Sequence, residues 1–149
     1  MLFSADVKSR LRLLAESYER LSGRPLAPPS ADLATWLWNH PTAIVAHGTQ
    51  ADPVFFFGNR TTLGLFELEF EAFTQPPSRL SAGSMLRDER EQVLARVTAH
   101  DIIEDYSGVS VSSTGRRFRI ERATVWNLLD EAGERHGQAA LFAHWTPIN

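Results

Sequence analysis

The chain has 149 residues, a formal net charge of −3 at pH 7 and a pI near 5.9. This length fits one domain, which buries about two thirds of the surface of its unfolded chain, and the acidic balance argues against binding to the phosphate backbone of nucleic acids. The chain contains no cysteine, which excludes disulfides, thiolate nucleophiles, zinc sites with cysteine ligands and cysteinyl flavin adducts.

The N-terminal segment MLFSADVKSR lacks the basic start and the apolar core of a signal peptide. No later run of apolar residues approaches the length that spans a bilayer. We therefore expect a cytoplasmic protein without a membrane partner.

Apolar residues near the N-terminus recur at alternating steps of four and three, which places them on one stripe of a helix. They are Val7, Leu11, Leu14, Tyr18 and Leu21. Gly23 and Pro25 end this helix. The stripe supports two interpretations, because it can pack on the protein's own core or form a seam with a second copy of the chain. Under the second interpretation the stripe is a partner-binding surface and the protein is a homodimer.

A proline-rich connector follows, and Asp32 is placed to cap a short helix that Pro41 ends, so residues 1–41 are predicted to be a helical extension. The next residues favour strands at 43–46 and 53–57. Asn59 is placed to cap a further helix, and two more helices are predicted over residues 69–74 and 88–100. The alternating carboxylates Glu67, Glu69 and Glu71 are interpreted as a solvated surface.

The last third of the chain contains three strand-like runs, EDYSGVSVSS, RRFRIERATVWNLL and GQAALFAHW. The turns between them contain Gly115 and Gly133, and glycine suits such turns because they often need a positive φ. This pattern predicts a three-stranded antiparallel meander. Since strands and helices are segregated along the chain, the fold class is α+β, with an antiparallel sheet and helices on one face.

Four segments carry a resemblance to a known family: HGTQADPVFFFGNRTTLGLFEL, PPSRLSA, EDYSGVSVSSTGRRFRIERATVWNLLDEAG and GQAALFAHW. They resemble the MEKHLA domain family, whose members are similar to PAS sensor domains. The resemblance runs from the first helix to Trp145, and the hexapeptide after which the family is named does not occur. It implies one PAS-like domain over residues 1–149 with its core at 42–146. It also implies a five-stranded sheet in the order 2-1-5-4-3 and a pocket between sheet and helices.

The sequence shows no catalytic or metal-binding constellation. It has no HExxH spacing, no G-x-S-x-G elbow and no phosphate-binding glycine loop. His136 and His144 would lie about 26 Å apart on one strand, too far to share an ion. We therefore predict no catalytic residues, no metal and no resident cofactor. The PAS resemblance leaves two alternatives, a haem on His100 and a flavin, because Trp126-Asn127-Leu128-Leu129 resembles a tetrapeptide of flavin-binding PAS domains.

The arginines at 116, 117, 119 and 122 are the most prominent charged group. Arg117 and Arg119 alternate with Phe118 and Ile120, as in a half-buried strand. The arginine face is either solvated and ion-paired or a partner-binding surface formed by Arg117 and Arg119. Beyond Ile120 the alternation fails, which indicates either a bulge or a strand covered on both faces.

Aromatic and polar residues of the strands and helices supply a candidate ligand pocket. Its predicted members are Phe55, Phe57, Phe66, Val97, Tyr106, Trp126, Asn127, Gln138 and Phe142. We expect a non-catalytic sensory or regulatory domain that binds a small molecule or a protein partner. The alternatives are a structural dimerisation module with a filled core and, third, a small enzyme whose reaction the sequence does not specify.

Overall fold

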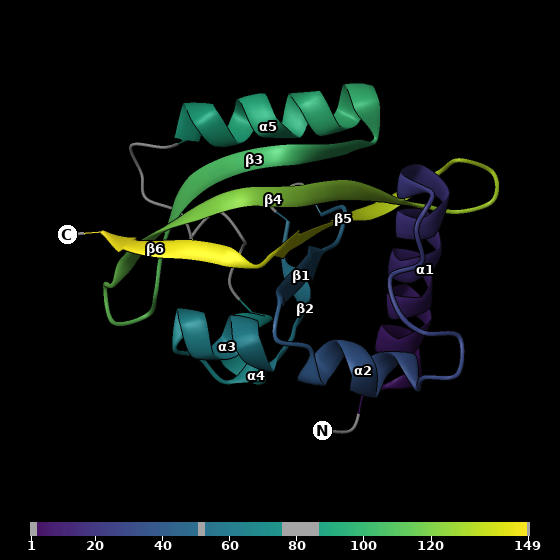
Figure 1. The fold of residues 1–149 in the computed structure, drawn as a ribbon, viewed down its shortest axis with the longest axis horizontal. Coiled ribbons are helices and arrows are strands. Elements are labelled where there is room, and N and C mark those ends of the chain that lie inside the picture. The colour runs from purple at the N-terminus through teal and green to yellow at the C-terminus, as the bar shows by residue number, and fades with distance from the viewer. Residues whose placement is uncertain (1–2, 51–52, 76–86, 149) are drawn as a thin grey trace.

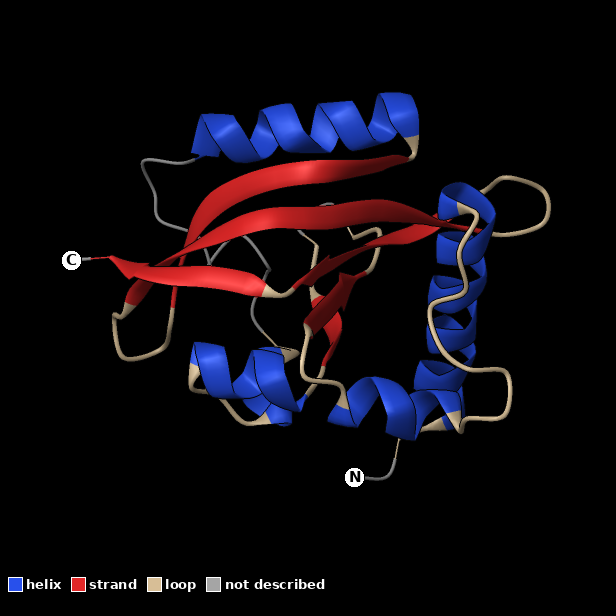
Figure 2. Cartoon of the chain, viewed as in Figure 1, coloured by secondary structure: helices blue, strands red, loops and turns tan. Residues whose placement is uncertain are grey.

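The computed structural model describes residues 3–50, 53–75 and 87–148 (Figure 1). The helices are α1 (Ala5–Ser22), α2 (Leu33–Asn39), α3 (Arg60–Phe66), α4 (Phe70–Phe73) and α5 (Arg87–His100). The strands are β1 (Ala43–His47), β2 (Phe55–Gly58), β3 (Ile102–Val111), β4 (Arg117–Leu129), β5 (Arg135–Phe142) and β6 (His144–Ile148). Figure 2 shows the strands as one curved sheet with helices around it.

The strands pair antiparallel in the order β2-β1-β5-β4-β3, which confirms the predicted order. A sixth strand was not predicted. The run GQAALFAHW bends at Ala143 and divides into β5, which pairs with residues 124–129 of β4, and β6, which pairs with residues 117–121. Both strands therefore lie along the same edge of the long strand β4.

The helices that follow β2 lie on one face of the sheet, as predicted, and the N-terminal helices, whose face was not predicted, pack on the other. Helices α3, α4 and α5 supply Phe66, Phe73 and Val97 to the inner face. Helices α1 and α2 supply Leu14 and Leu37 to the outer face. The N-terminal extension is therefore part of the core instead of an appendage.

Helix α1 packs on its own chain, which is the first of the two interpretations of its apolar stripe. Its N-cap Ser4 accepts a hydrogen bond from the N–H of Val7, and its C-cap Gly23 has a left-handed φ of 78°. Leu11 and Leu14 are fully buried in the outer-face cluster, while Val7, Tyr18 and Leu21 are partly buried against it. The buried part of the stripe is thus unavailable to a second chain.

The break in alternation along β4 has both of the predicted causes. Tyr106 and Gly108 of β3 pair with Ala123 and Ile120 of β4, so β4 contains one extra residue in this segment. Arg122, which lies in it, has a φ of 53°. This bulge restores the inward direction of Ala123. Beyond it both faces are covered, since Val125 packs under α5 and Trp126 under α1.

Candidate functional site

The inner face of the sheet carries an aromatic cluster that contains three of the predicted pocket residues. Phe55 of β2 stacks on Phe73 of α4 with ring centroids 4.5 Å apart. Phe66 of α3 meets Phe118 of β4 edge-on at 5.3 Å, and Phe142 of β5 belongs to the same buried cluster. These rings come from both the sheet and the helices, as an apolar pocket wall requires.

Tyr106 and Val97 extend this surface toward α5. Val97 is fully buried against Ile103 and Val125, and Tyr106 packs on both this group and the aromatic cluster. Tyr106 lies back over Gly108 of its own strand, where an added Cβ would stand 2.2 Å from the tyrosine hydroxyl. Glycine at position 108 is therefore required for this position of the ring.

Two buried amides interrupt the apolar inner face where β4 and β5 approach the end of α5. Asn127 and Gln138 stand opposite each other in the β4–β5 pairing and are 2% and 4% exposed. The Nε2 of Gln138 donates to Oδ1 of Asn127 at 3.4 Å, and Arg135 Nε donates to the same oxygen at 3.2 Å. The amides thus form one connected polar group.

The Asn127 amide also holds the C-terminal end of α5. Its Nδ2 donates to the carbonyl of Val97 at 3.1 Å and to Oδ1 of Asp101 at 3.0 Å. Its backbone N–H donates to the Asp101 carbonyl at 2.9 Å, and Asp101 has a left-handed φ of 64°. Asn127, a polar residue of the inner face, is therefore hydrogen-bonded to the C-terminal end of α5.

Two predicted pocket residues, Phe57 and Trp126, lie on the other face. Both are fully buried in the outer cluster, and Trp126 donates from Nε1 to the carbonyl of Leu14 of α1 at 3.1 Å. For Trp126 the reason is strand alternation, since successive side chains point to opposite faces and Asn127 points inward. For Phe57 it is a register shift in the β1–β2 pairing, where Ala46 and His47 stand opposite Phe57 and Phe55. Trp126 and Asn127 could not both have belonged to one pocket.

The predicted partner-binding arginines lie on the outer face of β4, before the bulge. Arg119 is exposed and stands opposite Thr146 of β6, and Arg117 is half-buried opposite Ile148. They lie away from the α1 stripe, which covers the far half of the same strand. The structure therefore separates the two groups of residues that the sequence assigned to partner binding.

Glu67 forms a clamp between α3 and the β3–β4 turn, although the sequence pattern assigned it to a solvated surface. Its φ is 59°, and its carboxylate accepts hydrogen bonds from the hydroxyls of Ser112, at 2.6 Å, and Thr114. Arg116 Nε lies 3.8 Å from the same carboxylate. The hydroxyl donors, Ser112 first, hold the pKa of Glu67 below its usual value. No motif marks this clamp, because Glu67 lies 45 positions from Ser112 and 47 from Thr114.

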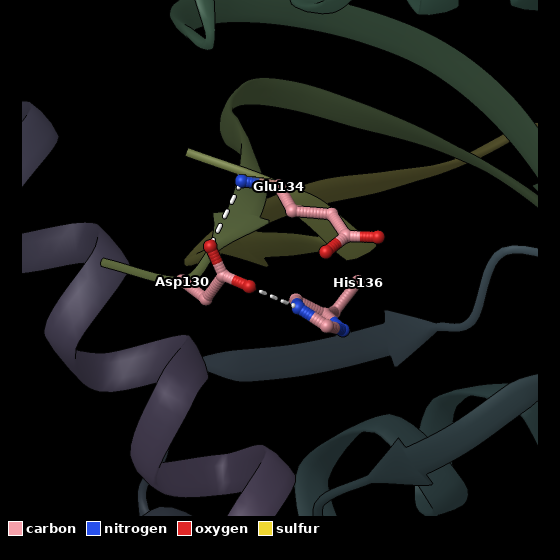
Figure 3. Close-up of side chains that lie close together, drawn as sticks. All are labelled: Asp130, Glu134 and His136. Carbon is pink, nitrogen blue, oxygen red and sulfur yellow. Dashed lines mark hydrogen bonds and ion pairs between the residues drawn. The ribbon is translucent and has the colours of Figure 1, made fainter. Parts of the chain in front are cut away.

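The turn between β4 and β5 brings together three groups that could ligate a metal ion (Figure 3). One ligand atom each from Asp130, Glu134 and His136 lie within 4.8 Å of one another. Asp130 Oδ1 accepts the N–H groups of Ala132 and Glu134, both at 2.9 Å, and Oδ2 lies 2.8 Å from His136 Nε2. The bond to His136 is the main cause that keeps the pKa of Asp130 below its usual value. These contacts identify Asp130 as the residue that closes the turn.

His100, the histidine considered for a haem, is exposed at the C-terminal end of α5. Among the described helices, none has the length and apolar character needed to cross a membrane.

The order of the strands and the helices on the inner face define a PAS-like fold, and solved structures agree. The PAS domain of a protein from Colwellia psychrerythraea superimposes with a TM-score of 0.66 at 15% identity, covering 77% of this chain and 92% of that one. The dark structure of the blue-light photoreceptor Aureochrome1 LOV gives a TM-score of 0.60 at 15% identity, over 85% and 89% of the two chains.

The sequence matches the MEKHLA domain over residues 8–147, and the chain belongs to this family. The homeobox-leucine zipper protein ATHB-14 of Arabidopsis thaliana is 30% identical over 96% of this chain and 18% of its own length. The homeobox-leucine zipper protein HOX29 of Oryza sativa subsp. indica is 29% identical over 74% of this chain and 13% of its own. The chain thus spans less than a fifth of these relatives.

Proposed function

We propose that this chain is a sensory or regulatory domain without catalysis of its own, and that its inner sheet face binds a small molecule. The observation that carries the proposal is the buried amide pair Asn127 and Gln138, with buried His47 opposite Gln138, on a face lined mainly by aromatic and aliphatic side chains. A few polar groups on an apolar wall give a small ligand its orientation.

The amide pair also supplies a route from ligand to protein. A ligand that hydrogen-bonds to Asn127 competes with Val97 and Asp101, the two groups through which Asn127 holds the end of α5. Binding would then change the equilibrium between α5 held on the sheet and α5 released from it. A ligand shifts such an equilibrium only if it makes different contacts in the two states. We propose that this change in α5 alters the binding of a protein partner at the exposed surface around Arg119.

The chemistry of the pair favours a planar heterocycle whose edge both donates and accepts hydrogen bonds. A flavin is one such compound, and one structural neighbour, with a TM-score of 0.62 at 11% identity, is a light-oxygen-voltage domain studied with a flavin analogue. The absence of cysteine means that this chain cannot form a thiol adduct with a flavin. A bound heterocycle would therefore act as a ligand or a redox group.

Native mass spectrometry of the purified protein, compared with its mass after denaturation, tests the proposal together with an absorbance scan for flavin or haem. We expect a bound compound, or a rise in melting temperature with members of a heterocycle panel. Asn127→Leu and Gln138→Leu should abolish that binding, whereas Asn39→Leu, which removes an exposed amide at the end of α2, should not. No added mass and no thermal response to the panel would contradict a ligand site.

The second candidate is a structural interaction module with a filled core. It is favoured by the side chains of the described residues, in which every buried nitrogen and oxygen has a hydrogen-bond partner within the chain. Sedimentation separates the two candidates, because the module is expected to form a homodimer that no metabolite stabilises. A monomer that responds to a heterocycle would reject the module.

A further inference from the structure

A cavity that lies apart from the amide pair is enclosed by α3, the β3–β4 turn and β6. Its volume is about 530 Å³, within the usual range of small-molecule sites. Figure 1 shows α3 beneath the yellow strand β6, with the turn at one end of this space. Its walls are formed by Gly64, Leu65, Glu67, Gly115, Arg116, Arg117, Phe118, Trp145, Pro147 and Ile148.

The apolar part of this groove is held in place by the core. Phe118 is 3% exposed, and Trp145 is half-buried and meets Phe142 edge-on with centroids 5.9 Å apart. Leu65 and Ile148 are half-buried on the two sides. An aromatic or aliphatic body placed here would cover apolar surface that the chain leaves partly exposed.

The polar part of the groove is basic, although the chain as a whole has a net charge of −3. The side chain of Arg116 is 81% exposed and Arg117 lines the same cavity. The acidic group, Glu67, already accepts the hydroxyls of Ser112 and Thr114, and its side chain is 27% exposed. The guanidinium of Arg116 lies 3.8 Å from Glu67 and can turn toward a second carboxylate.

We propose that this groove binds a small carboxylic acid with an aromatic or aliphatic body. The body packs on Leu65, Trp145 and Ile148, and the carboxylate pairs with the guanidinium of Arg116. The exposed guanidinium of Arg116 selects the acid, because Glu67 beside it accepts both hydroxyls on Oε2 and lies 3.8 Å from Arg116 through Oε1. This site does not depend on the inner-face amides.

Titration of the ¹⁵N-labelled protein with 2-naphthoate tests the assignment, and the indole N–H signals report it. The chain has four tryptophans, and Trp145 lines the groove while Trp126 is fully buried with its N–H bonded to the Leu14 carbonyl. We expect the Trp145 signal, identified by Trp145→Phe, to shift with a Kd on the order of 1 mM and the Trp126 signal to stay unchanged. Absence of a saturable Trp145 shift would overturn the site.

Two comparisons test the carboxylate. The neutral 2-naphthamide and the variant Arg116→Gln should each weaken binding about fivefold, the value of one partly exposed ion pair. Arg12→Gln removes the same charge from the exposed surface of α1 and should leave the affinity unchanged. Equal shifts with naphthoate and naphthamide would overturn the proposal and leave only an apolar surface.

Discussion

The two halves of β4 differ both in sequence pattern, RFRIER before the bulge and ATVWNLL after it, and in their surroundings. Before the Arg122 bulge, Phe118 and Ile120 are buried while Arg119 between them is exposed. After the bulge, residues 125–128 are all buried, because α5 covers one face and α1 the other. The first half is an ordinary half-buried strand and the second is a central strand of a three-layer core.

This difference shows where the domain is stabilised and where it can interact. The enclosed half contributes Trp126 to the core and Asn127 to the inner face, so changes there affect stability and ligand binding together. The open half offers Arg119 to solvent and borders the groove beside β6. Four predictions test the contrast, from the largest effect to the smallest.

Trp126→Ala should lower the free energy of unfolding by about 3 to 5 kcal/mol, because it empties a core site and removes the bond to the Leu14 carbonyl. Urea unfolding followed by circular dichroism measures the loss. Arg119→Ala in the open half is the control and should change stability by less than about 0.5 kcal/mol. Similar losses for the two variants would refute the contrast.

Asn127→Leu should cost about 2 kcal/mol, since it leaves the Val97 carbonyl and the Asp101 carboxylate without their amide donor. Hydrogen exchange should become faster at the C-terminal end of α5. Exchange in α1, on the opposite face, serves as the reference. Unchanged protection in α5 would show that Asn127 does not hold the helix.

Arg122→Val should cost about 1 kcal/mol, because a β-branched residue is poorly accommodated at a φ of 53°. Arg122→Gly keeps the left-handed conformation accessible and should be tolerated. Melting temperatures of the pair measure the difference. If valine were as stable as glycine, the bulge would not separate the two halves.

Glu67→Gln should have a smaller effect that depends on pH. Because hydrogen bonding lowers the pKa of Glu67 in the folded state, its contribution is present above the unfolded value of about 4.3 and is lost as pH falls through the folded pKa. The stability difference between wild type and variant should therefore shrink below about pH 4. A difference that is constant down to acid pH would argue against the clamp.

Local patterns predicted most elements of the fold. Gly115 and Gly133 have the left-handed φ values of 88° and 82° expected of the turns, and Asn59 caps α3 by accepting from the N–H of Thr62. The strand order came from the family resemblance. Of the nine predicted pocket residues, Phe57 and Trp126 were assigned to the wrong face, because residue type marks a side chain as apolar but does not fix its direction. Strand alternation turns Trp126 away from Asn127, and a register shift between β1 and β2 separates Phe57 from Phe55.

Other features depend on contacts between distant segments. The Glu67 clamp joins residues 45 to 47 positions apart, and the Asn127 amide reaches Val97 across 30 positions. The meeting of Asp130, Glu134 and His136 depends on how the β4–β5 turn closes. The helical and strand periodicities of the sequence do not predict contacts between such distant residues.

The sequence alone determined the class of the domain, its meander, its turns and the place where β4 loses alternation, because these follow from side-chain period and backbone preference. The tertiary structure decided which face each residue of β4 occupies beyond the bulge, that the α1 stripe is part of the core, and that β6 is a separate strand. Those outcomes depend on which buried surfaces meet, and burial is a property of the packed chain.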